Sequence, residues 1–141
     1  MISVTASPQI CAGAAFEVVS ASASKAKDLG VSVCIAVYAA SGHEVAFLRL
    51  DNAPDMCAGI ARDKAYTAAC FGQATHAWAD LLAAEHTRVL AGLQRVPRFV
   101  TVGGGLPLKA EKDLIGGIGV SGGSEEQDIV CAAAGVQVLN Q

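Results

Sequence analysis

GGGLPLKAEKDLIGGIGVSGGSEEQD, residues 103–128, is the stretch around which this sequence is organised. It holds eight of the chain's fifteen glycines. Glycine weakens a strand through backbone entropy and has no side chain to pack. Gly116, Gly117 and Gly119 nevertheless lie inside an apolar, partly β-branched run. They therefore predict a strand with a bulge, or one that another backbone or a ligand approaches closely.

A helix start follows this run directly. Residues 121–123 read Ser-Gly-Gly, which is typical of a tight turn. Ser124 and Gln127 have the spacing of a capping box, and three acidic residues suit the positive end of a helix dipole: Glu125, Glu126 and Asp128. The stretch therefore predicts a hairpin, a glycine-lined strand, a tight turn and a helix.

The rest of the chain divides by its apolar periodicity and its turn residues. We expect a first helix near residues 10–29, opened by Ser7-Pro8 and ended by Gly30. The further elements are expected as strands 31–38 and 45–50, helices 57–71 and 77–90, strands 98–102, 106–110 and 114–121, and a helix 125–139. Hairpins dominate this order and no regular strand–helix–strand alternation occurs. It predicts a single α+β domain over residues 1–141, with helices on the faces of an antiparallel sheet.

Composition limits the classes of partner. The chain is 52% hydrophobic with a mean hydropathy of +0.43, so we expect a homo-oligomer that covers apolar surface. A net charge of −3 and scattered Lys and Arg argue against nucleic-acid binding. No run approaches the ~18 apolar residues of a membrane span, and the first ten residues lack the features of a secretory signal.

The five cysteines are far apart and form no C-x-x-C pair. An odd, scattered set of this kind supports neither a disulfide framework nor a structural zinc site. It indicates reduced thiols in a cytoplasmic protein. Cys57, at a loop-to-helix junction, is the thiol best placed for nucleophilic chemistry, but no histidine adjoins it in the sequence.

Several motifs together resemble one family. They are RLDNA (49–53), KAYTA (64–68), GGGLP (103–107), IGGIGVSGG (115–123) and EEQD (125–128). In this order they resemble the GlcG/HbpS family, which includes the C-terminal domain of PduO-type corrinoid adenosyltransferases. Ala39 stands where many relatives carry Asp, and the first helix lacks the histidine that some haem-binding relatives use.

The resemblance implies a profilin-like α+β fold, with an antiparallel five-stranded sheet flanked by helices. It also implies oligomers and, in several members, binding of haem or a related tetrapyrrole. We therefore expect haem as a possible cofactor, held in a groove beside the glycine-rich strand. The ligand-binding candidates lie in the shared motifs: Arg49, Lys64, Thr67, Gly103, Gly104, Gly105, Pro107 and Ser121.

The glycine turn has two interpretations. Backbone N–H groups of residues 120–123, just before a helix N-terminus, could hold a carboxylate or a phosphate. Alternatively, the glycines serve tight strand–helix packing, and the acidic residues that follow would repel an anion. The segment matches neither nucleotide-binding glycine motif.

Arg49, Asp51 and Lys64 also have two interpretations. Arg49 could hold a ligand carboxylate through two hydrogen bonds while Lys64 adds a second positive charge. The alternative is a structural ion pair that joins Arg49 or Lys64 to a nearby aspartate: Asp51, Asp55 or Asp63.

No histidine pair has the i, i+4 spacing of a helical metal site. His43, His76 and Tyr66 could each be axial if haem binds, and no C-x-x-C-H motif exists for covalent attachment.

Three functions remain open. The first is a haem-binding or tetrapyrrole-binding oligomer. The second is an accessory enzyme of a catabolic pathway that acts on a small carboxylate by proton transfer or hydrolysis. Its catalytic candidates are Lys64, which with Arg49 would orient the anion, and Asp51, Glu126 or Asp128 as acid or base. For this enzyme we expect K64M to abolish turnover and leave the fold intact. The third is a scaffolding oligomer without a small ligand.

Overall fold

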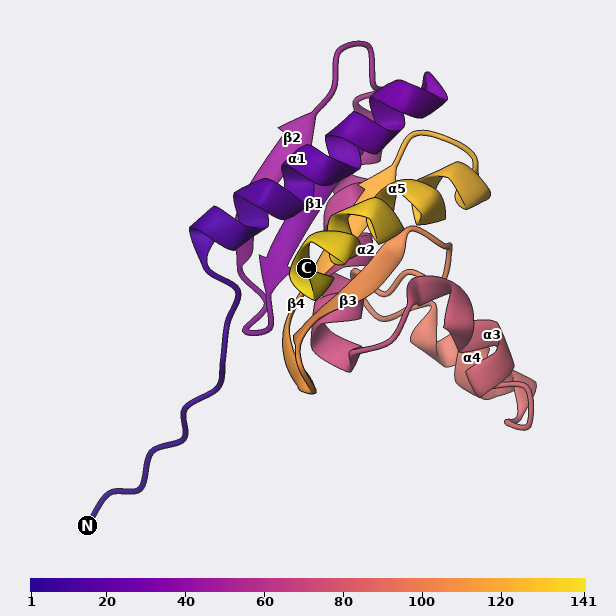
Figure 1. Ribbon diagram of the computed structural model, residues 1–141. Helices are drawn as coiled ribbons and strands as arrows, with labels where there is room; N and C mark the ends of the chain where they lie inside the picture. Colours follow the sequence, from indigo (N-terminus) through magenta and orange to yellow (C-terminus); the bar gives the residue numbers. More distant parts are fainter.

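A four-stranded antiparallel sheet, in the order β2–β1–β4–β3, forms the centre of the computed structural model, which describes residues 1–141 (Figure 1). The strands are β1 (Cys34–Ala39), β2 (Glu44–Arg49), β3 (Gly105–Ala110) and β4 (Asp113–Ser121). The α-helices are α1 (Ala12–Leu29), α2 (Met56–Phe71), α3 (Trp78–Leu81), α4 (Thr87–Leu93) and α5 (Glu125–Gln137). Two 3₁₀ turns are η1 (Thr75–Ala77) and η2 (Val138–Asn140). The α+β class is confirmed.

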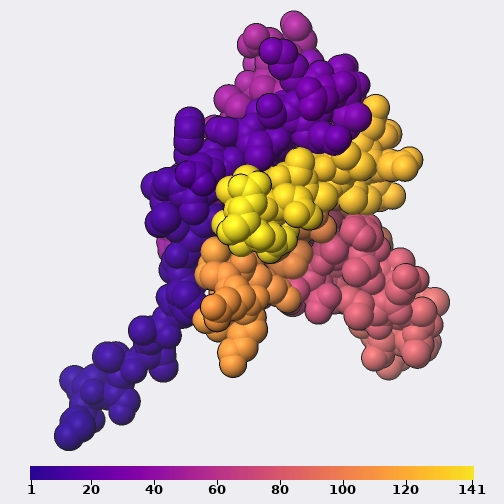
Figure 2. All heavy atoms as spheres, in the orientation of Figure 1, coloured from indigo at the N-terminus to yellow at the C-terminus, as the bar shows by residue number.

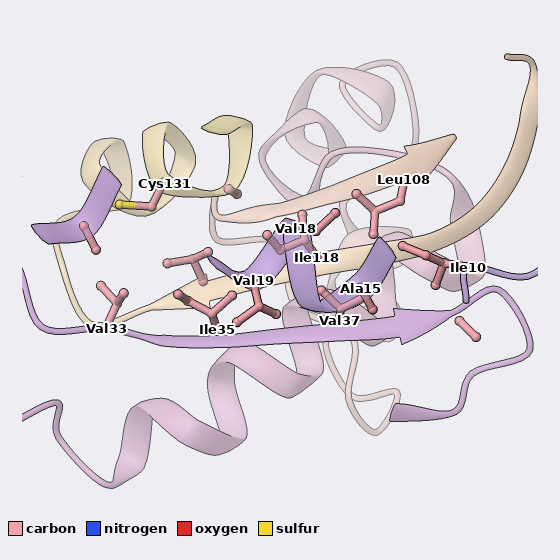
Figure 3. Close-up of a cluster of buried hydrophobic side chains, with 14 of the residues drawn as sticks. Ile10, Ala15, Val18, Val19, Val33, Ile35, Val37, Leu108, Ile118 and Cys131 are labelled. Carbon is pink, nitrogen blue, oxygen red and sulfur yellow. The ribbon is translucent and has the colours of Figure 1, made fainter. Parts of the chain in front are cut away.

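Helices α1 and α5 cover one face of the sheet, where the larger core lies (Figure 1). Alternate residues of the two central strands point into it, namely Ile35 and Val37 of β1 and Ile118 and Val120 of β4. Figure 3 shows these strands packed beneath Val18 of α1 and Cys131 of α5. Side chains two apart on a strand share a face, so the period-two pattern of the strands produces this core.

Helix α2 covers the opposite face, and its alanines lie directly on β4. A Cβ at Gly117 would lie 2.5 Å from the Ala65 carbonyl oxygen and 2.6 Å from the Ala69 nitrogen. A Cβ at Gly119 would overlap the backbone of Ala61 and Ala65. The predicted close approach to another backbone is thus confirmed, and that backbone belongs to α2.

The sheet has four strands, so the expectation of five is wrong. Residues 98–102, predicted as a strand, form none. Arg98 has a left-handed backbone (φ 70°), which lies outside the extended region of regular strands. The Thr67 hydroxyl donates to the Arg98 carbonyl (2.8 Å) and accepts from the Val100 N–H (3.1 Å). A side chain of α2 therefore satisfies the groups that a neighbouring strand would have bonded.

Two predicted helix boundaries are also wrong. The first helix begins at Ala12 rather than after Ser7, because Ile10 is buried in the core and its N–H donates to the Ile115 carbonyl (3.0 Å). The helix predicted over 77–90 is split into α3 and α4, and His86 caps the second by accepting from the Arg88 N–H (3.1 Å).

The two predicted hairpins are present, and α5 begins with the predicted capping box of Ser124 and Gln127. The segment from η1 to α4 forms a lobe that projects from the body, and the first residues extend away from it (Figure 2). None of the helices combines the length and hydrophobicity that a bilayer span requires.

The contact between α2 and β4 yields a stability prediction. We expect Gly119→Ala to lower the free energy of unfolding by about 2–4 kcal/mol, because the new methyl group meets backbone that cannot move aside. Gly59→Ala, on the exposed side of the same helix with no atom within 4 Å, should raise it by about 0.5–1 kcal/mol. Urea denaturation measures both, and equal stabilities for the two variants would contradict this packing.

Candidate functional site

Lys64 lies in a buried ion pair. Its side chain leaves α2 and reaches Asp128 of α5, the helix on the other face of the sheet, with 3.1 Å between Nζ and Oδ2. The ammonium also donates to the Val120 carbonyl (2.9 Å). Lys64 is 1% exposed and Asp128 is 3% exposed. The structural interpretation of Lys64 is therefore the observed one, but its partner is Asp128 and none of the three aspartates expected.

Asp128 also occupies the predicted anion-binding position at the backbone N–H groups of residues 120–123. Its Oδ1 accepts from the Gly123 N–H (2.9 Å), so the turn after β4 already binds a carboxylate of the protein itself. Burial raises the pKa of the Asp128 carboxyl above its usual range, although Lys64 and the amides of Gly122 and Gly123 act in the opposite direction.

The Gly103–Gly105 loop is closed in the same way by the chain's own side chains. The Gly103 N–H donates to Glu125 (2.9 Å), and the Gly105 N–H donates to the Thr75 hydroxyl (3.0 Å). Gly104 has φ 122°, and a Cβ there would lie 2.9 Å from the Lys64 ammonium. Helix α2 and this loop thus fill the place where the sequence predicts a groove beside the glycine-rich strand.

Arg49 closes the loop that follows β2. Its Nε and one Nη donate to the Ala53 carbonyl at 2.9 and 2.7 Å, so it forms none of the ion pairs considered from the sequence. Among the four acid–base candidates, only Lys64 and Asp128 are joined by a hydrogen bond. Asp51 and Glu126 are exposed and bond to neither, so the four do not converge on one site.

The remaining candidates lie apart from one another. Pro107 is in the edge strand β3, where a missing N–H is tolerated, and Ser121 is buried at the end of β4. His43 is exposed beside the Ser41 hydroxyl (3.0 Å), and His76 is exposed in η1.

A cavity of about 200 Å³ lies on the outer side of α2. Tyr66, Thr67, Cys70 and Phe71 of that helix line one wall, and Val96, Pro97, Arg98 and Phe99 line the other. Cys70 is an exposed free thiol, whereas burial raises the pKa of Cys34 and Cys131 above the usual range.

Three aromatic rings form the base of the projecting lobe beside this cavity. Phe71, Trp78 and Phe99 meet edge to face, with ring centroids 5.0–5.8 Å apart. Edge-to-face pairing stabilises such clusters beyond the area that they bury. Phe71 remains 51% exposed, so an apolar surface continues outward from the cavity.

Arg98 is the charged residue of the cavity wall. Its guanidinium lies over the Tyr66 ring, 4.0 Å from the centroid, and donates to Asp63 (2.9 Å) and to the Tyr38 hydroxyl (3.0 Å). Burial lowers the pKa of Arg98, but the bonds to Asp63 and Tyr38 raise it on balance above its usual value. Arg98 is therefore a permanent cation beside the aromatic residues of the cavity wall.

Of the predicted ligand-binding residues, only Thr67 lines this cavity, together with Tyr66, which was considered as an axial ligand. One feature of the sequence could have indicated this cavity. The alanines of α2 occupy one side, so Tyr66, Cys70 and Phe71 must lie on another.

Residues 10–137 match the family described as haem degrading protein HbpS-like. The chain is 35% identical over 134 residues to an uncharacterized 15.0 kDa protein of Citrobacter freundii, encoded between dhaT and dhaS, and the match spans 94% of this chain and 93% of that protein.

Two solved structures have the same fold. A double mutant of HbpS from Streptomyces reticuli superposes with a TM-score of 0.88 at 30% identity, over 98% of this chain and 92% of the other. A complex of PduOC with haem superposes with a TM-score of 0.83 at 31% identity, over 94% and 96% of the two chains.

The buried ion pair yields a prediction. We expect K64M or D128N alone to lower the free energy of unfolding by about 3 kcal/mol or more, because each leaves a buried partner unpaired. The structure thus replaces the expectation that K64M leaves the fold unaffected. Thermal and urea denaturation of the single and double variants would measure the coupling.

The double variant K64M/D128N should be less destabilised than the sum of the two single variants. E44Q, which breaks the exposed Arg62–Glu44 pair, should cost no more than about 1 kcal/mol and serves as the control. Strictly additive effects of K64M and D128N would exclude the pairing.

Proposed function

This chain belongs to the HbpS-like family, and we propose that it binds haem or a related tetrapyrrole in the cavity between α2 and residues 96–99. The haem complex of PduOC, which shares this fold, supports the class of ligand. The observation that carries the choice of site is the apolar cavity, bordered by an exposed aromatic ring, on the outer face of α2.

The shape and chemistry of the cavity suit one edge of a flat macrocycle. Its volume of about 200 Å³ is below the ~300–1,000 Å³ of sites that enclose a whole small molecule. Phe99 and Tyr66 offer aromatic surfaces to a ring that enters, and the exposed Phe71 and Val96 continue the apolar surface outside. The ligand would therefore be partly open to solvent or to a second copy.

Two side chains in the wall could hold the iron. A cysteine thiolate and a tyrosine are both haem ligands, and Cys70 and Tyr66 line the cavity. Tyr66 is the one residue among the predicted axial candidates that does so, since His43 and His76 are not part of the wall. Bound haem would supply redox and ligand-binding chemistry, and this chain would supply an apolar surface that orients it.

We further propose that the protein works in the cytoplasm as a homo-oligomer. Several large apolar side chains are exposed on the single chain, among them Phe16, Met56 and Phe71, and association would cover such surface. The exposed free thiols of Cys11 and Cys70 suit a reducing compartment.

Haemin titration tests the function. Adding haemin to the purified protein should give a saturable change of the Soret band at micromolar concentration. Phe71→Ala should weaken binding about threefold to tenfold, because an aromatic contact is worth about that factor. Phe16→Ala, at another exposed phenylalanine on α1, should bind as the wild type does. Absence of a saturable change would contradict haem binding, and equal affinities of F71A and F16A would contradict the site.

A further inference from the structure

We propose that Arg98 selects the ligand of this cavity by pairing with a carboxylate at the edge of the ring, and that Asp63 limits the strength of that pair. This inference rests on the proposed function. The inference goes beyond that function by naming the chemical group that a bound ring must carry.

Side chains of α2 fix Arg98 in place. Its left-handed conformation is held by Thr67, whose hydroxyl bonds to the Arg98 carbonyl and to the Val100 N–H. The guanidinium is held over the Tyr66 ring, and the Tyr38 ring lies 5.2 Å away. A group that is already ordered loses little entropy when a ligand binds, so Arg98 is prepared to recognise one.

Arg98 also has N–H groups that form no hydrogen bond within the protein. Nε bonds to Asp63 and one terminal nitrogen bonds to Tyr38, which leaves the other terminal nitrogen without a hydrogen-bond partner. The side chain is 36% exposed, so a ligand can reach it. No other residue that lines the cavity is charged. Charge-assisted bonds to a carboxylate are strong beside apolar walls, whereas a ring without a carboxylate cannot form such a bond with this group.

Asp63 has the opposite effect on the same ligand. Its carboxylate lies 2.9 Å from Nε and partly neutralises the guanidinium. It carries the same charge as an incoming carboxylate and occupies a donor that could otherwise serve the ligand. Removing the charge of Asp63 should therefore strengthen binding of an acid, while removing Arg98 should weaken it.

Helix α2, which carries Asp63, also offers a matched control. Arg62 is also paired with a carboxylate, Glu44 (2.7 Å), and also lies over an aromatic ring, Phe47 (3.9 Å). Its side chain is 38% exposed, close to the value for Arg98, but it does not line the cavity. R62Q and E44Q thus reproduce the loss of a stacked surface ion pair away from the proposed site.

The experiment compares haemin with its dimethyl ester, which has the same ring and no free carboxylate. The wild type should bind haemin about tenfold more tightly than the ester. R98Q should lose this preference by weakening haemin alone, and D63N should increase it about threefold. R62Q and E44Q should keep the wild-type preference, and the far-UV circular dichroism of each variant reports its fold.

The outcomes separate the two proposals. If the wild type binds haemin and its ester equally well, Arg98 does not select a carboxylate and the inference is overturned, whatever R98Q does. If R98Q weakens both ligands to the same extent, its role is structural. If neither ligand binds, the proposed function itself fails.

Discussion

The direct contact between helix α2 and strand β4 determines where the functional groups of this protein lie. Gly117 and Gly119 carry no side chain, so the backbone of α2 rests on the strand itself. The alanines of α2 face the sheet. The Lys64 side chain is buried and forms an ion pair with Asp128 of α5, on the other face of the sheet. The outer face of the helix is left with Tyr66, Cys70 and Phe71. One packing constraint thus buries a lysine and presents an apolar surface.

This constraint moves the candidate site away from the glycines. Glycine-rich segments that open a helix often bind anions, and here the position is taken by the carboxylate of Asp128. The loop amides of Gly103 and Gly105 are likewise bonded to Glu125 and Thr75. The polar groups of this motif join the two faces of the sheet, and we propose that residues outside the motif bind the ligand.

The sequence predicted what depends on local pattern. The two hairpins, the capping box at Ser124 and the glycine end of α1 follow from short-range spacing, and all three are present. Prediction from the sequence failed where groups distant in the chain determine the conformation. Arg98 leaves the strand region because Thr67, 31 residues earlier, bonds to its carbonyl. The partner of Lys64 lies 64 residues away, and nothing in the local sequence selects Asp128 over a nearer aspartate.

We propose that the ligand binds on the outer face of α2 rather than beside the glycine-rich strand. Gallium protoporphyrin IX is diamagnetic, so its titration into isotopically labelled protein can be followed by amide NMR. Binding on the outer face of α2 predicts the largest shifts at residues 66–71 and 96–99, with little change at residues 116–123. Largest shifts at residues 116–123, with residues 66–71 unaffected, would contradict it.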